Sequence, residues 1–101
     1  MITFHDDYEP ETRDIFGDGT EYITLEPDRA ILVRRRKQLG LTQQQVADAA
    51  HIQLRQYQRL ESGERSMASA SLRIGLSVCA VLQLDPRRFI FVPQQKNLQK
   101  L

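Results

Sequence analysis

Between Thr42 and Gly63 the chain reads TQQQVADAAHIQLRQYQRLESG, a stretch that holds two short amphipathic helices with almost no loop between them. Thr42 is a good N-cap, and Gln45 completes a capping box for the first helix. The second helix runs from about Gln53 to Ser62, and Gly63 is a natural terminator. The apolar faces are Val46, Ala47 and Ala50 in the first helix and Leu54, Tyr57 and Leu60 in the second. Helices joined by about three residues must cross steeply, as they do in a helix-turn-helix.

Charge is segregated along the chain, although the net charge of the whole is only +1. Residues 1–28 hold nine acidic residues and one basic residue, for a net charge of −8. Residues 29–101 hold thirteen basic and four acidic residues, for a net charge of +9. A basic body attracts a polyanion before any specific contact forms, so this pattern favours DNA as the partner. The alternative is that both halves are solvated surfaces and the asymmetry is accidental.

Size and composition limit the classes of protein that this chain can represent. Its 101 residues, 41% of them hydrophobic, predict one domain with a modest core, and dimerisation would bury more apolar surface. Cys79 is the single cysteine, and His5 and His51 are too isolated for a metal site. No run approaches a membrane span, and the acidic N-terminus has no apolar signal region. We therefore expect a cytoplasmic protein with no metal, no cofactor and no catalytic site.

The sequence divides into three parts. Residues 1–26 form an acidic N-terminal arm, residues 27–92 a DNA-binding body, and residues 93–101 a polar tail. In the arm, apolar alternation at residues 14–16 and 21–25, on either side of a glycine-rich turn, predicts a short β-hairpin. We expect the first dozen residues to be disordered or loosely docked.

Three further helices are predicted around the central pair. The first runs from Pro27 and Asp28 to Leu39, with acids at its start and bases at its end, as the helix dipole favours. Another is capped by Ser69 or Ser71 and reaches Leu82; Gly75 inside it suggests that a neighbouring helix packs closely there. A short fifth helix follows Asp85-Pro86 and ends at Phe89.

With these residues in view, the chain resembles the phage-repressor and Cro-like helix-turn-helix family, also called the xenobiotic-response-element type. The matching residues are Leu41-Thr42-Gln43, Ala47 and Leu60-Glu61-Ser62-Gly63, with Ser62 in place of the usual Asn. The resemblance covers about residues 29–90. It implies an all-α, five-helix, lambda-repressor-like DNA-binding domain, with residues 1–26 outside it.

Two positions depart from the family pattern. His51 stands where the family usually has a glycine, at a position that tends to need a positive φ and costs a residue with a Cβ about 1 kcal/mol. Tyr57 replaces the usual Ile or Val; its ring can be buried while its hydroxyl stays at the protein–DNA boundary.

The resemblance implies that the second helix of the motif enters the major groove with its N-terminal residues at base edges. Arginine suits guanine and glutamine suits adenine, so we expect Arg55 and Arg59 to read bases and the glutamines to share bases and phosphates. The predicted DNA-binding residues are Gln43, Gln53, Leu54, Arg55, Gln56, Gln58 and Arg59, with Gln43 on a phosphate. The alternative is a solvated helix face. For Glu61 the resemblance implies a structural ion pair with Arg36, because an acid beside DNA would repel phosphate.

The sequence thus predicts a sequence-specific transcriptional regulator, a repressor that binds double-stranded DNA as a homodimer. The main alternative is an antitoxin that represses its own promoter and binds a basic toxin through the acidic arm. A third hypothesis is a protein-interaction module that kept the fold and lost DNA, and the Gln and Arg face argues against it. Residues Phe89 to Val92 either form the dimer surface or fold back onto the first helix.

Overall fold

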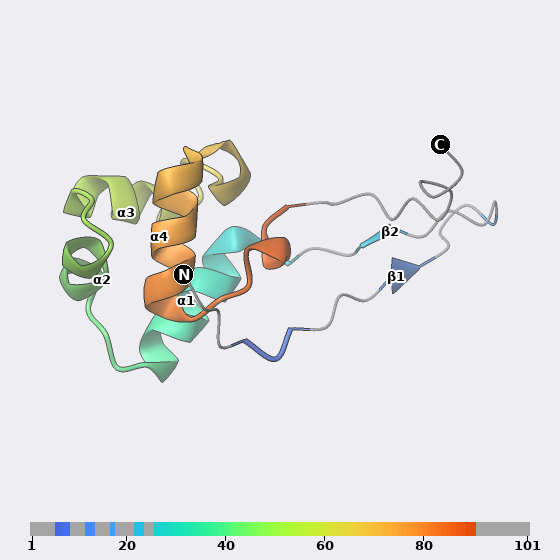
Figure 1. Cartoon of the computed structure of the whole chain (residues 1–101), viewed down its shortest axis with the longest axis horizontal. Helices are drawn as coiled ribbons and strands as arrows, with labels where there is room; N and C mark the ends of the chain where they lie inside the picture. Colours follow the sequence, from blue (N-terminus) through green and yellow to red (C-terminus); the bar gives the residue numbers. More distant parts are fainter. Residues whose placement is uncertain (1–5, 9–11, 14–16, 18–21, 24–25, 91–101) are drawn as a thin grey trace.

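Four α-helices make up the body of the protein in the computed structural model, which describes residues 6–8, 12–13, 17, 22–23 and 26–90 (Figure 1). They are α1 (Asp28–Gln38), α2 (Gln43–Ala49), α3 (Leu54–Ser62) and α4 (Leu72–Leu82), with single 3-10 turns η1 (Met67–Ser69) and η2 (Pro86–Arg88) before and after α4. Helices α2 and α3 lie together at one end of the body, and the strands of the N-terminal arm lie at the opposite end.

The short fifth helix predicted after Asp85-Pro86 is present as a single 3-10 turn, Pro86–Arg88, with Asp85 as its cap and Phe89 at its end. Its cap is local: the Asp85 carboxylate accepts a hydrogen bond from the Arg87 N–H at 2.8 Å. The turn then ends at Phe89, whose side chain is buried. Of the two alternatives for this segment, Phe89 takes the one that completes the core of the monomer, while residues 91 and 92 lie outside the described part of the chain.

The ends of the helices follow from short-range hydrogen bonds that the sequence predicts. The Thr42 hydroxyl accepts from the Gln45 N–H at 3.1 Å, and the Gln45 amide oxygen accepts from the Thr42 N–H at 2.9 Å, so the capping box is confirmed. Gly63 ends α3 with a φ of +84°, a left-handed conformation that suits glycine. At the start of α4 the Ser71 hydroxyl accepts from the Ile74 N–H at 3.2 Å.

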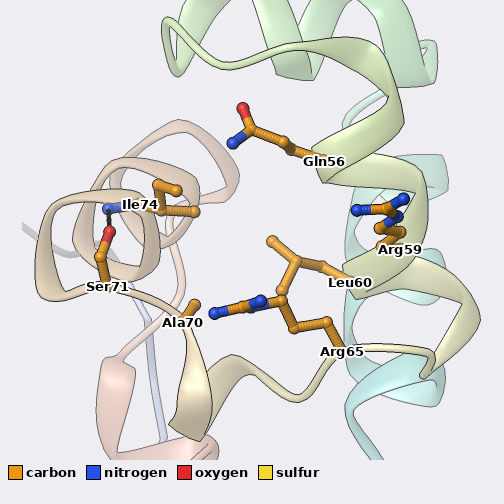
Figure 2. Close-up of a pocket in the computed structure, with 7 residues that line it drawn as sticks. All are labelled: Gln56, Arg59, Leu60, Arg65, Ala70, Ser71 and Ile74. Atoms are coloured by element: carbon orange, nitrogen blue, oxygen red, sulfur yellow. Dashed lines mark hydrogen bonds between the residues drawn. The ribbon is translucent and has the colours of Figure 1, made fainter.

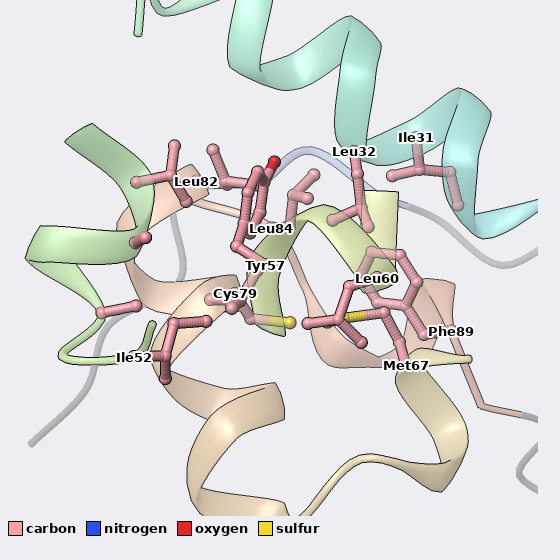
Figure 3. Close-up of a cluster of buried hydrophobic side chains, with 14 residues drawn as sticks. Ile31, Leu32, Ile52, Tyr57, Leu60, Met67, Cys79, Leu82, Leu84 and Phe89 are labelled. Atoms are coloured by element: carbon pink, nitrogen blue, oxygen red, sulfur yellow. The ribbon is translucent and has the colours of Figure 1, made fainter. Parts of the chain in front are cut away.

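One hydrophobic core lies among the four helices (Figure 3). Each helix buries one side: Ile31 and Leu32 from α1, Val46 and Ala47 from α2, Tyr57 and Leu60 from α3, and Val78, Cys79 and Leu82 from α4. Burial raises the pKa of the Cys79 thiol to about 12, so this cysteine is a core residue, as predicted. No helix in the described part of the chain is long and apolar enough to cross a membrane.

Two features of α4 were not predicted: the open space beside Gly75 and the contact of Arg35 with the C-terminal end of the helix. A Cβ added to Gly75 would meet only the Met67 carbonyl oxygen, at 4.0 Å, so no helix packs closely there and that expectation is wrong. At the other end of α4, Arg35 donates to the carbonyl oxygens of Leu82 at 2.9 Å and Gln83 at 3.1 Å. A cation at a helix C-terminus is favourable.

The described part of the arm contains two short strands and one firm contact with the body. Strand β1 (Thr12–Arg13) pairs antiparallel with β2 (Tyr22–Ile23), whereas residues 14–16, predicted as the first strand, lie outside the described residues. Asp6 forms a bidentate ion pair with Arg88, at 2.6 and 2.7 Å, and accepts from the Asp85 N–H at 2.8 Å. The Tyr8 ring lies 4.6 Å from the Arg88 guanidinium. Residues 6–8 therefore dock on the body.

Candidate nucleic-acid interface

Helices α2 and α3 are joined by a tight turn over residues 50–53. The Ile52 N–H donates to the Ala47 carbonyl at 3.0 Å, which closes the end of α2. His51 adopts a φ of +56°, the left-handed conformation expected at this position from its place in the motif. The turn is thus formed without glycine, at a conformational cost of about 1 kcal/mol.

Opposite its buried side, α3 presents a polar face to solvent. Gln53, Arg55, Gln56, Gln58 and Arg59 are exposed, and Leu54 is half-buried against the core. Gln43 is half-buried at the start of α2 and lies beside this face, because the Gln58 amide donates to the Gln43 amide oxygen at 3.3 Å. Of the seven predicted DNA-binding residues, Gln43 and Gln58 are thus in direct contact, and the other five belong to α3 or its N-cap.

A helix-turn-helix family model matches residues 32–87, more than half of the chain and the whole of the α2–α3 pair. The chain belongs to the Cro/C1-type helix-turn-helix family. Neither a curated protein nor a solved structure matched it. As a member of this helix-turn-helix family the protein is a DNA-binding transcriptional regulator.

A buried polar network holds α3 in place. Arg36 on α1 donates two hydrogen bonds to the Glu61 carboxylate, at 2.9 and 2.7 Å. The predicted structural ion pair is therefore confirmed. Gln43 donates to the same carboxylate at 3.1 Å, and Arg36 also donates to the Leu41 carbonyl at 3.1 Å. Three helices thus meet at Glu61. Burial favours a raised pKa for Glu61, but hydrogen bonds and charge from Arg36, together with the hydrogen bond from Gln43, outweigh it and lower the pKa below its usual value.

Tyr57 completes the inner side of this network. Its side chain is fully buried, and its hydroxyl makes no hydrogen bond of good geometry with the described residues. Burial, followed by the nearby Glu61 carboxylate, raises the pKa of this hydroxyl. The expectation that the hydroxyl reaches the protein–DNA boundary is therefore wrong, because the hydroxyl is buried with the rest of the side chain.

Arg55 and Arg59, the two arginines of α3, make few contacts with other groups of the protein. No group in the described part of the chain hydrogen-bonds or pairs with Arg55, which lies in the first turn of α3. Arg59, one turn later, has the Glu64 carboxylate at 3.8 Å, and both side chains are largely exposed, at 44% and 64%. An exposed pair of this length contributes little, so both guanidinium groups are available to a ligand.

A shallow pocket of about 180 Å³ separates the second half of α3 from the start of α4 (Figure 2). Its lining residues are Gln56, Arg59, Leu60, Arg65, Ala70, Ser71 and Ile74. Arg65 extends toward Ala70 across this pocket, and its guanidinium lies 3.4 Å from the Ser69 carbonyl oxygen. In the sequence, the available signal for Arg65 is its place two residues after Gly63, the glycine that ends α3.

Basic residues on the side of the molecule that faces the arm are paired with acids. Arg34 pairs with Glu26 at 2.9 Å, and Arg88 pairs with Asp6 at 2.6 Å. These contacts neutralise positive charge away from α3, whereas Arg55 and Arg65 have no acidic partner among the described residues. Arg55 and Arg65 thus keep their positive charge available to a polyanion near α3.

Proposed function

We propose that this helix-turn-helix protein is a sequence-specific repressor that binds double-stranded DNA as a homodimer, with α3 in the major groove. The observation that carries the proposal is the two-sidedness of α3, which buries Tyr57 and Leu60 and presents Arg55 and Arg59 to solvent. A helix of this kind fits the width of the major groove. Its orientation is set before binding, because Glu61 ties it to α1 and α2.

The surface around α3 suggests how the remaining residues contribute. Gln43 at the N-terminal end of α2 and Arg65 beyond the C-terminal end of α3 flank the recognition helix on its two sides. Side chains placed there would meet the phosphates that border the groove, where such contacts set register rather than sequence preference. Gln53, Leu54, Arg55, Gln56, Gln58 and Arg59 are the candidates for contact inside the groove.

A second surface suits the homodimer. Leu72 and Ile90, exposed at 77% and 40%, are the exposed large hydrophobic residues of the described chain, and both line one apolar groove of about 110 Å³. Gly75, Leu76 and Pro86 line the same groove. A second copy, docked by a two-fold axis, would cover both side chains and place two recognition helices on one face of the duplex, about 34 Å apart.

Selection from a random duplex library tests DNA recognition. The full chain should enrich a near-palindromic site, and Arg55→Ala should weaken binding to that site by about 1–3 kcal/mol while leaving binding to random duplex nearly unchanged. Arg29→Ala removes the same charge from the exposed start of α1 and serves as the matched control. Enrichment of no sequence, or equal losses in both variants, would contradict the proposal.

Sedimentation of the free protein tests the dimer. Leu72→Glu adds a carboxylate in the first turn of α4, where the helix dipole stabilises a negative charge. The substitution should therefore not harm folding. The wild type should associate at micromolar concentration, and the variant should sediment as a monomer with an unchanged melting temperature. A wild type that stays monomeric both free and on its selected site would remove the homodimer.

A second candidate function, an antitoxin that represses its own promoter, is favoured by the charge of the arm. Residues 1–28 carry a net charge of −8, and the described contacts neutralise only part of it, through Asp6 and Glu26. The excess suits a basic protein partner. Co-expression with the product of the adjacent gene tests this role: rescue of growth and a salt-sensitive complex that is lost on truncation of the arm would support it, and a harmless neighbour would contradict it.

A further inference from the structure

Three of the side-chain amides on the surface of α2 and α3, those of Gln43, Gln56 and Gln58, already form hydrogen bonds within the protein. The Gln56 amide oxygen accepts from the Gln53 backbone N–H at 3.0 Å, as part of the cap of α3. Gln43 uses both ends of its amide, since it donates to Glu61 at 3.1 Å and accepts from Gln58 at 3.3 Å. Gln58 donates one of its two amide N–H groups in that contact. A glutamine that reads adenine presents its amide oxygen and one N–H side by side, and the internal hydrogen bonds already orient these three amides toward other groups of the protein.

Arg55 and Arg59, in contrast, have few contacts within the protein. Nothing in the described residues holds the Arg55 guanidinium, and only an exposed carboxylate at 3.8 Å lies near Arg59. A guanidinium presents two parallel N–H donors, which match the O6 and N7 acceptors that guanine shows in the major groove. Neither arginine loses a strong contact when it turns to a base.

From this contrast we infer that the protein reads guanine through Arg55 and Arg59, and that Gln43, Gln56 and Gln58 position the helix instead of reading adenine. The inference rests on the proposed function and adds the base preference of its recognition helix. Arg55 and Arg59 are four residues apart, about 6 Å along α3. Residues four apart project from the same side of a helix, so each half-site should contain two guanines, one for each arginine.

The test begins with the site that the full chain selects from random duplex. Each guanine is then replaced singly by 7-deazaguanine, which keeps Watson–Crick pairing and removes the N7 acceptor. Wild-type affinity should fall about tenfold at each of the two positions. Arg55→Lys and Arg59→Lys keep the charge but lose the paired donors. Each should become insensitive to deaza substitution at one guanine and remain sensitive at the other.

Gln56→Ala and Gln58→Ala are the matched variants on the same helix. Both should bind the selected duplex with unchanged base preference, and Gln56→Ala should cost some thermal stability through the lost cap. A selected site whose discrimination lies in A·T pairs, relaxed by Gln56→Ala or Gln58→Ala, would overturn the inference while leaving the proposed function intact. Guanines that tolerate deaza substitution would also overturn it. Failure to enrich any site would instead contradict the proposed function itself.

Discussion

Replacing Glu61 with glutamine should lower the free energy of unfolding by about 3–5 kcal/mol, the usual cost of removing one member of a buried ion pair. The Glu61 side chain is 6% exposed and that of Arg36 15% exposed. Glutamine has the same shape but only one acceptor oxygen, whereas Glu61 accepts two hydrogen bonds from Arg36 and one from Gln43. In the variant an amide N–H₂ would face one of these donors, and the Arg36 charge would stay buried without an opposite charge.

Urea unfolding, followed by circular dichroism at pH 7, measures this loss. For a domain of this size the melting temperature should fall by more than about 10 °C. Glu64→Gln, which changes an exposed carboxylate only a few residues away, is the matched control and should shift stability by less than about 0.5 kcal/mol. Arg36→Met combined with Glu61→Met should recover much of the loss, because no charge is left buried.

The pH dependence follows from the lowered pKa of Glu61. The ionised carboxylate stabilises the folded state at any pH above the pKa it has when unfolded, about 4.3, and this contribution is lost as pH falls through the lower folded value. The stability difference between wild type and Glu61→Gln should therefore be full at pH 7 and shrink below about pH 4. A variant of unchanged stability with an altered base preference would refute the reasoning and place Glu61 at the DNA.

Three further predictions concern single positions. His51→Gly should stabilise the protein by up to about 1 kcal/mol in thermal unfolding, since it relieves a φ of +56°, whereas Gly63→Ala should destabilise it by a similar amount; the same sign for both would contradict this. Gly75→Ala should raise the melting temperature by about 4–8 °C, because the added methyl has room inside α4; a decrease would reveal a contact that the structure lacks. Asp6→Asn should cost about 1–3 kcal/mol at pH 7, through the bonds that Asp6 accepts from Arg88, and hydrogen bonding by Arg88 holds the pKa of Asp6 below its usual value. The Asp6 carboxylate stabilises the folded state above its unfolded pKa, and this effect is lost as pH falls through its folded pKa. In urea unfolding, the stability difference between wild type and Asp6→Asn should therefore narrow below about pH 4. A difference that does not change with pH would contradict the ion pair.

The features that could be predicted from the sequence are those decided over a few residues. Thr42, Ser71 and Gly63 mark helix ends because capping depends on side chains and backbone within one turn. The left-handed His51 and the Arg36–Glu61 pair were accessible through the family pattern, which specifies both positions.

The features that escaped prediction depend on contacts distant in sequence or on competition among equivalent groups. Asp6 pairs with Arg88, which lies 82 residues later in the sequence, and no local pattern marks either residue as the partner of the other. The helix expected after Asp85-Pro86 is one 3-10 turn, and the burial of Phe89 directly after it depends on residues distant in sequence. Glutamine is polar and favours helices in any setting, and only the structure shows which amide of Gln43, Gln56 or Gln58 is already bonded.

Disulfide cross-linking to a thiol tethered in the major groove tests the placement of α3 most directly. Cys79 is buried with a thiol pKa of about 12 and should not react, so a cysteine introduced by Gln53→Cys reports on the start of the recognition helix alone. The account predicts efficient cross-linking of Gln53→Cys to a major-groove tether within the selected site, and none for Arg29→Cys or the wild type. Equal cross-linking from Arg29→Cys, or a preference of Gln53→Cys for a minor-groove tether, would contradict the account.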